Sequence, residues 1–194
     1  VLRIAPLAAF LGVLFGVILG MLMGYLRGWF DTVASRIVEA FLALPVVLIA
    51  LLAVTTLGSS SWVVTGVVAA LFTPIVARTV RSAVLAERDL DYVTSARLRG
   101  ESNLFIMFRE VLPNVMGPIV VELTVRVGYA VFTVATLSFI GAGPPPPSPD
   151  WGAQVSENYN SIISGFWWTT FFPAAAIASG VSRIDISLAF DSYL

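Results

Sequence analysis

The sequence contains no cysteine, no histidine and no lysine, and all eleven of its basic residues are arginine. The absence of cysteine excludes disulfides, and the absence of both cysteine and histidine excludes the usual zinc sites and imidazole acid–base catalysis. The absence of lysine excludes a lysine nucleophile and the lysine of a phosphate-binding P-loop. The chain therefore cannot form a P-loop ATPase by itself.

Charged residues are also scarce: they make up 12% of the 194 residues, whereas hydrophobic residues make up 58%. A soluble domain usually has about 25% charged residues. The apolar residues fall into long blocks, and about 20 mostly apolar residues suffice for a membrane-crossing helix. Because backbone polar groups in hydrocarbon must be satisfied internally, we predict an all-α, polytopic transmembrane bundle. Five membrane segments are expected, at about 4–26, 37–57, 62–86, 115–140 and 166–189.

The placement of arginine predicts the orientation of these segments, because cytoplasmic connections are enriched in basic residues. The first connection contains Arg27 and Arg36, and six further arginines lie in or beside the third connection, within residues 78–109. The second connection, residues 58–61, and the fourth, about 141–165, contain no arginine. We therefore expect the first and third connections in the cytoplasm. The fourth is expected outside, as a Pro-rich loop stiffened by four successive prolines.

A glycine stripe runs along the first segment. Glycines recur every four residues, at Gly12, Gly16, Gly20, Gly24 and Gly28, so they share one helix face. Another backbone can approach such a face closely. The stripe is either a subunit interface or a packing surface within this chain.

The third connection predicts a short helix, a tight turn and a second helix that re-enters the membrane. Asp89 or Asp91 is expected to cap the first helix, because a carboxylate accepts hydrogen bonds from the free N–H groups there. Gly100 fits the left-handed position just after this helix. Ser102 or Asn103 is expected to cap the second helix.

Two functions are open for the short helix. It is either a connector between two spans or a knob that fits a groove on a soluble partner. In the second case the small residues Ser95, Ala96 and Gly100 would allow close approach. Tyr92 would then supply a buried anchor.

Two pairs of charged residues lie in the apolar segments. Glu122 and Arg126 are four residues apart and can pair along one helix. They are expected either to line a solute pathway or to form a local pair. Near the end, either the helix carrying Arg183 and Asp185 reaches the cytoplasm near Ser182, or both residues face the interior of the bundle.

The segment Tyr92-Val-Thr-Ser-Ala-Arg-Leu-Arg-Gly100, followed by Leu112-Pro113-Asn114, resembles the EAA loop of binding-protein-dependent ABC importer permeases. That pattern has Glu-Ala-Ala, three residues, Gly, nine residues and then Ile-x-Leu-Pro. Four residues match in register: Ala96, Gly100, Leu112 and Pro113. Three differ: Thr94, Ser95 and Glu110 replace Glu, Ala and Ile.

Other motifs resemble the dipeptide, oligopeptide and nickel branch of that family. They are Gly24-Tyr25 with Gly28-Trp-Phe-Asp31, Arg36-x-x-Glu39, Leu44-Pro45, Leu137-Ser-Phe-Ile-Gly-Ala-Gly143, Pro147-Ser-Pro-Asp-Trp-Gly152 and Phe172-Pro173. The resemblance implies a single permease domain over residues 1–194, of the type I ABC importer kind. It implies six helices in the full chain, so one helix is expected to precede those seen here.

The resemblance also implies a function and partners. The chain would form half of a pathway for peptides or a similar small solute, in the bacterial inner membrane, and would itself catalyse no reaction. Its partners would be a second permease subunit, an external solute-binding protein and two ATPase subunits, which hold ATP and Mg; no cofactor or metal is expected on this chain, and no nucleic acid. The coupling loop, residues 87–113, would contact an ATPase. The expected coupling residues are Asp91, Tyr92, Thr94, Ser95, Ala96, Arg97, Gly100, Leu112 and Pro113.

The alternatives are an ATP-independent secondary transporter or channel, and a membrane enzyme. A secondary transporter is expected to have ionisable residues inside several helices, and only Glu122 and Arg126 are clear candidates. An enzyme needs a set of nucleophile, base or metal ligands, for which the composition provides little.

Overall fold

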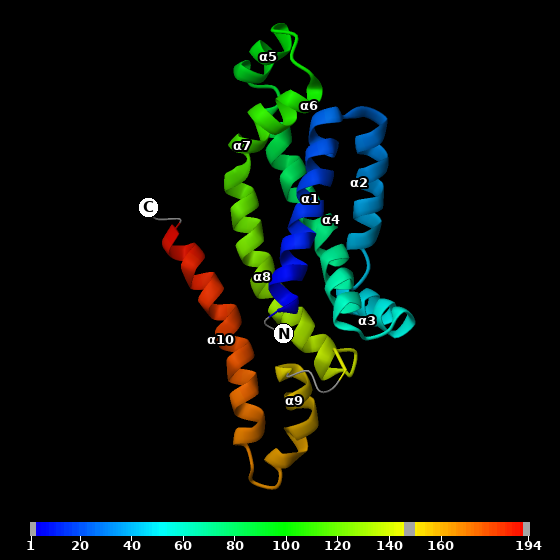
Figure 1. The fold of residues 1–194 in the computed structure, drawn as a ribbon, viewed down its shortest axis with the longest axis vertical. Coiled ribbons are helices and arrows are strands. Elements are labelled where there is room, and N and C mark those ends of the chain that lie inside the picture. Colours follow the sequence, from blue (N-terminus) through cyan, green and yellow to red (C-terminus); the bar gives the residue numbers. More distant parts are fainter. Residues whose placement is uncertain (1–2, 146–149, 192–194) are drawn as a thin grey trace. The chain divides into compact units, whose positions relative to one another are not determined.

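The computed structural model describes residues 3–145 and 150–191, with side chains described up to residue 182. Every regular element in these ranges is a helix (Figure 1), which confirms the predicted all-α class. The chain divides into two compact units. Unit 1 comprises Val1–Leu11, Pro45–Leu71 and Thr124–Leu194, and unit 2 comprises Gly12–Leu44 and Phe72–Leu123.

Among the described residues, three helices are long and apolar enough to cross a membrane. They are α1 (Ile4–Leu26), α4 (Ser61–Glu87) and α8 (Met116–Phe139), and they coincide with three of the predicted segments. The pair α2 (Gly28–Leu42) and α3 (Val46–Leu57) makes a fourth span if the two are taken together. The last predicted segment, residues 166–189, folds as α10 (Trp168–Asp191). The chain is thus a multi-pass membrane protein.

The second predicted segment, residues 37–57, differs from expectation in two ways. The sequence predicts one helix kinked at Pro45, but the helix stops before Pro45, which has extended backbone and begins α3. Proline lacks the N–H of a continuous helix and disfavours helical backbone in the residue before it. In addition, α2 begins at Gly28, directly after α1. Arg27 (φ 53°) and Gly28 (φ 74°) both have positive φ, so the first connection is only a tight reversal.

The glycine stripe of α1 packs inside unit 2. A Cβ on Gly16 would lie 2.5 Å from Val76 Cβ of α4. A Cβ on Gly20 or Gly24 would come within 2.8 Å of atoms of α4 as well. Since these distances are shorter than any real Cβ contact, only glycine permits this approach of α1 to α4. Packing within the chain, one of the two predicted roles, is therefore confirmed for these three glycines.

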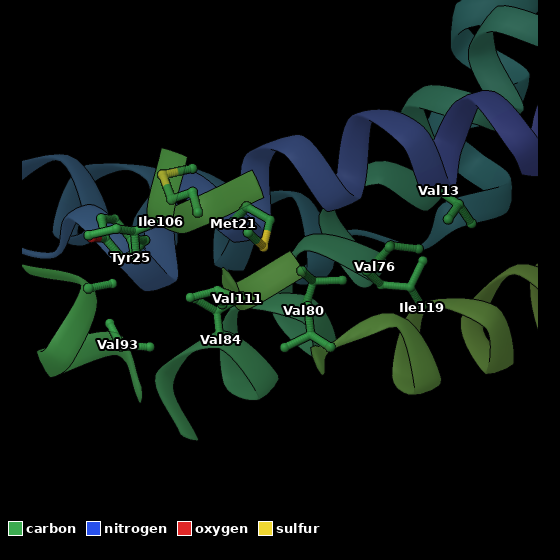
Figure 2. Close-up of a cluster of buried hydrophobic side chains, with 13 residues drawn as sticks. Val13, Met21, Tyr25, Val76, Val80, Val84, Val93, Ile106, Val111 and Ile119 are labelled. Atoms are coloured by element: carbon green, nitrogen blue, oxygen red, sulfur yellow. The ribbon is translucent and has the colours of Figure 1, made fainter. Parts of the chain in front are cut away.

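A buried cluster fills the space between the helices of unit 2 (Figure 2). Members of the cluster come from α1, α4, the third connection and the start of α8, and include Met21, Val80, Val93, Ile106 and Ile119. Burial of such side chains is worth about 1.5–3 kcal/mol each. The third connection is therefore part of the folded core of this unit.

An ion pair joins α2 to α4 in the same unit. Arg81 donates two hydrogen bonds to the carboxylate of Asp31, one of them from Nη2 to Oδ2 at 2.7 Å. Ser35 donates a further bond to Asp31 Oδ1 at 3.2 Å. On the exposed side of α2, Arg36 and Glu39 form an ion pair at 2.9 Å, the spacing of which the sequence predicts.

In unit 1, the short helix α9 (Trp151–Asn158) packs tightly against α8. The buried carboxylate of Asp150 caps α9 by accepting bonds from the backbone N–H groups of Gly152 and Ala153. A Cβ on Gly152 would collide with the carbonyl oxygen of Ala135. Residues 146–149 of the predicted Pro-rich loop, which include two of its four successive prolines, lie outside the described residues.

Candidate functional site

The short helix predicted in the third connection is present as α5 (Asp91–Leu98). In Figure 1 it lies at one end of unit 2, beyond the ends of α1 and α4. The predicted cap is wrong: the N-cap is Leu90, and no side chain bonds the free N–H groups there. Asp91 lies in the first turn, where its charge still favours the helix dipole. Asp89 instead pairs with Arg88 at 3.1 Å.

The turn after α5 has the predicted geometry. Gly100 has left-handed backbone, with φ +79°. Its N–H donates to Arg97 O at 3.0 Å, and the N–H of Glu101 donates to Ala96 O at 3.3 Å, which is the Schellman pattern of a glycine-terminated helix. Ser102 Oγ then accepts from Phe105 N at 3.3 Å and caps α6 (Asn103–Phe105), as predicted.

The two faces of α5 differ sharply in exposure. Val93 and Ala96 are fully buried in the core of unit 2. Thr94, Ser95 and Leu98 are exposed, Leu98 to 84%. This corrects the expectation for Ala96: its small side chain lets α5 approach its own core and does not lie on a face open to a partner. The exposed face combines small hydroxyl side chains with one large apolar side chain.

Tyr92 attaches α5 to the end of α4. It is half-buried, and its hydroxyl donates a hydrogen bond to Glu87 Oε2 at 2.9 Å. Burial, together with the adjacent Glu87 carboxylate, raises the pKa of Tyr92 to about 12. The sequence predicts Tyr92 as an anchor inside a partner, whereas the structure places it as an anchor within its own chain.

Tyr25, at the end of α1, joins the elements around α5, a role that the sequence motif Gly24-Tyr25 did not predict. It is buried, and its hydroxyl donates to Asn103 Oδ1 at 3.3 Å. The guanidinium of Arg97 lies 5.6 Å from its ring centroid, a cation–π distance. Arg88 donates to the carbonyls of Gly24 and Tyr25, at 3.1 and 2.6 Å. Tyr25 thereby links α1 to α4, α5 and α6.

One signal could have indicated this arrangement. The last carbonyls of a helix have no partner within the helix and require donors from elsewhere. An arginine-rich connection next to the end of α1 supplies such donors. Which arginine does so depends on how the helices pack, and the sequence alone does not give that.

The second helix of the connection is irregular. After α6 the chain forms a π-helical segment, η1 (Ile106–Val111), followed by α7 (Leu112–Asn114). Pro113 lacks an N–H and so cannot continue regular hydrogen bonding, a common reason for a local change of helix type. Leu112 is half-buried against the core, whereas Pro113 is exposed. Arg99 Nη2 bonds Glu110 Oε1 at 3.3 Å and so joins the turn to η1.

The two charged residues of α8 have different surroundings. Glu122, in unit 2, accepts a hydrogen bond from Thr79 Oγ1 of α4 at 2.8 Å. Arg126, in unit 1, lies with its guanidinium 5.3 Å from the ring centroid of Tyr129. Arg183 and Asp185 belong to α10, but their side chains fall outside the described residues. Among the described residues there is no group of three or more acidic side chains that could hold a metal ion.

The fold and this site define a helical membrane protein that presents a short, firmly attached helix at one end of a packed unit. Comparison with known families agrees with this class. The chain belongs to the family of binding-protein-dependent transport system inner membrane components, whose sequence pattern matches residues 16–190.

Individual relatives are similar over most of this chain. A glutathione transport system permease protein of Shigella flexneri is 42% identical over 170 residues, which are 88% of this chain and 56% of the relative. A dipeptide transport system permease protein of Alkalihalophilus pseudofirmus is 36% identical over 149 residues, covering 77% and 49%. The chain thus spans about half the length of the curated relatives it matches.

One solved structure has a similar fold. It is a chain of the MetNI methionine ABC transporter in an inward-facing conformation, with a TM-score of 0.68 and 18% identity. The match covers 94% of this chain and 92% of that one. At this identity the similarity concerns the fold alone, and it agrees with the predicted type I ABC importer bundle.

Proposed function

We propose that the chain is part of a permease subunit of an ATP-driven importer in the bacterial inner membrane. It forms half of a translocation pathway for peptides or a similar small solute. Family membership supports this proposal, as do relatives named for dipeptide and glutathione transport. The same family membership favours ATP-driven import over the ATP-independent carrier or channel.

The main support for the proposal is that α5 has one buried face and one exposed face. A helix of eight residues is not stable alone in water. Here its inner face, with Val93 and Ala96, is buried in the core, so its outer face is held in place. We infer that Thr94, Ser95 and Leu98 on that face enter a groove of an ATPase subunit. ATP and Mg stay on that subunit, and this chain catalyses no reaction.

The contacts of Tyr25 suggest how a movement of α5 reaches the membrane. The ring of Tyr25 lies beside Arg97 of α5, and its hydroxyl bonds Asn103 of α6. Its carbonyl oxygen, in the last turn of α1, accepts a bond from Arg88. We infer that α5, α6 and the end of α1 move together when the ATPase closes.

Glu122 and Arg126 are proposed to line the solute pathway. Both are half-buried charged residues in a membrane-crossing helix, where charges mark functional positions. Replacing both, as Glu122→Gln with Arg126→Gln, is expected to reduce solute uptake while the assembly with the ATPase stays intact. Unchanged uptake by that double variant would contradict the pathway role.

Co-purification tests the proposal as a whole. We expect the chain to purify together with a second, different permease subunit and two ATPase subunits, and to receive solute from an external binding protein. Variants Thr94→Arg and Ser95→Arg place bulky charges on the outer face of α5 and should release the ATPase. The matched control Arg36→Gln changes an exposed ion pair on α2 and should not. A pure homo-oligomer without ATPase would contradict the proposal.

A further inference from the structure

The connection between α9 and α10 presents an uncharged, apolar surface. No charged residue occurs between Glu157 and Arg183. Within this stretch the chain reverses through the short 3-10 helix η2 (Tyr159–Ile162) and the turn before α10. Eight large apolar side chains are exposed there, and Ile163, at the turn, is exposed to 90%. They are Tyr159, Ile162, Ile163, Phe166, Trp167, Trp168, Phe171 and Phe172. We refer to residues 159–172 as the aromatic turn.

The rings of the aromatic turn are held in place by contacts with one another. Phe166 and Trp168 meet edge to face, with centroids 5.3 Å apart. Trp167 packs in the same way on Phe171 at 5.6 Å, and Phe171 on Phe172 at 5.9 Å. Edge-to-face pairs contribute about 0.5–1.5 kcal/mol each beyond their buried area. The exposed patch is therefore preformed.

Several polar groups of the aromatic turn bond to main-chain carbonyls of the turn or of Asn158, the residue before it. Phe166 N donates to Ser161 O at 3.0 Å, and Gly165 N donates to Ile162 O at 3.1 Å. The hydroxyl of Thr170 donates to Asn158 O at 2.9 Å. Backbone that enters lipid must satisfy its polar groups internally, because hydrocarbon offers no partners. The bonds of this turn are compatible with that requirement.

We propose that the aromatic turn inserts into the lipid bilayer at the boundary between headgroups and acyl chains. Tryptophan and other aromatic side chains concentrate at that depth, where the ring is buried and the polar edge stays wet. A surface that binds a protein partner usually has polar and charged groups around its rim. This stretch of the chain has no charged residue. The turn thereby fixes the corner of α9 and α10 at the membrane surface of unit 1.

The absence of cysteine provides a direct test. Single substitutions Ile163→Cys and Glu157→Cys can be labelled with a nitroxide in the protein reconstituted in vesicles of phosphatidylethanolamine and phosphatidylglycerol. Collision with oxygen, which concentrates in lipid, is compared with collision with a water-soluble nickel chelate by electron paramagnetic resonance. Glu157 is the matched control, because it is exposed on α9 only six residues away and its charge belongs in water.

We expect oxygen to dominate at position 163 and the nickel chelate at position 157, so the logarithm of their ratio changes sign between the two. Phe172→Cys, the exposed side chain at the other end of the turn, should behave like position 163. Nickel-dominated contact at both 163 and 172 would overturn the proposal. Protection at 163 that arises only when a solute-binding protein or second permease subunit is added would also overturn it, in favour of protein docking.

Discussion

Replacing Gly100 is the sharpest test of how α5 is positioned. The residue has φ +79°, and a Cβ there would meet no atom within 4 Å. Space is therefore not limiting, and the cost of a substitution comes from the backbone alone. Left-handed backbone costs a residue with a Cβ about 1–2 kcal/mol, and β-branched residues tolerate it least. Asparagine tolerates it best.

These energies translate into a measurable population shift. The bonds from Gly100 N to Arg97 O and from Glu101 N to Ala96 O exist only while the turn is left-handed. A strain of about 1–2 kcal/mol lowers the equilibrium constant for the closed turn by roughly 5- to 30-fold. Gly100→Ala should show this loss, Gly100→Val a larger one, and Gly100→Asn little change.

Two measurements separate the turn from its function. Hydrogen exchange of the α5 amides should accelerate in the order Asn, Ala, Val, because local opening becomes easier. In vesicles containing the ATPase subunits, solute taken up per ATP hydrolysed should fall in the same order. If Gly100→Val exchanges and transports like the original protein, the account of the turn is wrong. If α5 opens faster but uptake per ATP is unchanged, Gly100 holds the turn as described, but the proposed coupling through α5 is wrong.

Three further predictions concern the surroundings of α5. Gly20→Ala should lower the melting temperature, because the new Cβ would lie 2.6 Å from a backbone oxygen of α4 and overpacking costs about 1–3 kcal/mol. In the control Gly66→Ala the new Cβ meets nothing within 4 Å, so the melting temperature should stay unchanged or rise. Equal changes in melting temperature for the two variants would contradict the packing of α1 on α4. Asp31→Asn should destabilise by about 1–3 kcal/mol, because Arg81 keeps its charge and loses its partner, whereas melting unchanged from the original would show the pair to be irrelevant. The pKa of Tyr92 is raised to about 12, so its protonated phenol stabilises the folded state, and this contribution should be lost as pH rises from about 10 to about 12. The titration of Tyr92 can be identified as the phenol signal that Tyr92→Phe removes. A midpoint near pH 10 for that signal would refute the prediction.

Much of the coupling loop could be predicted because its signals are local. A left-handed glycine after a helix, and a serine that caps the next one, depend on the chemistry of a few adjacent residues. Gly100 and Ser102 accordingly have the predicted roles. The cap at the start of α5 could not be predicted, because Asp89 has competing partners: Arg88, its neighbour in the sequence, and Arg27, which packing brings near.

The break at Pro45 could be predicted only in part. Proline at this position signals a disturbance of the helix, and its local chemistry disfavours continuous helix. Whether the chain kinks or stops depends on what the flanking helices pack against. The buried face of α2, with Ala34 and Val38, packs on α1 through Met23 and so favours a helix that begins early, at Gly28.

Block length, arginine placement and turn chemistry are properties of consecutive residues, so they were enough to predict a helical membrane protein with a helix–glycine–helix connection. The direction in which the residues of that connection face depends on how the helices pack. Ala96 lies in the core and Thr94 lies outside because α5 packs against α1, α4 and η1. The same packing brings Tyr25 into contact with the residues around α5. Contacts between residues distant in the sequence fix these orientations, and no local pattern contains them.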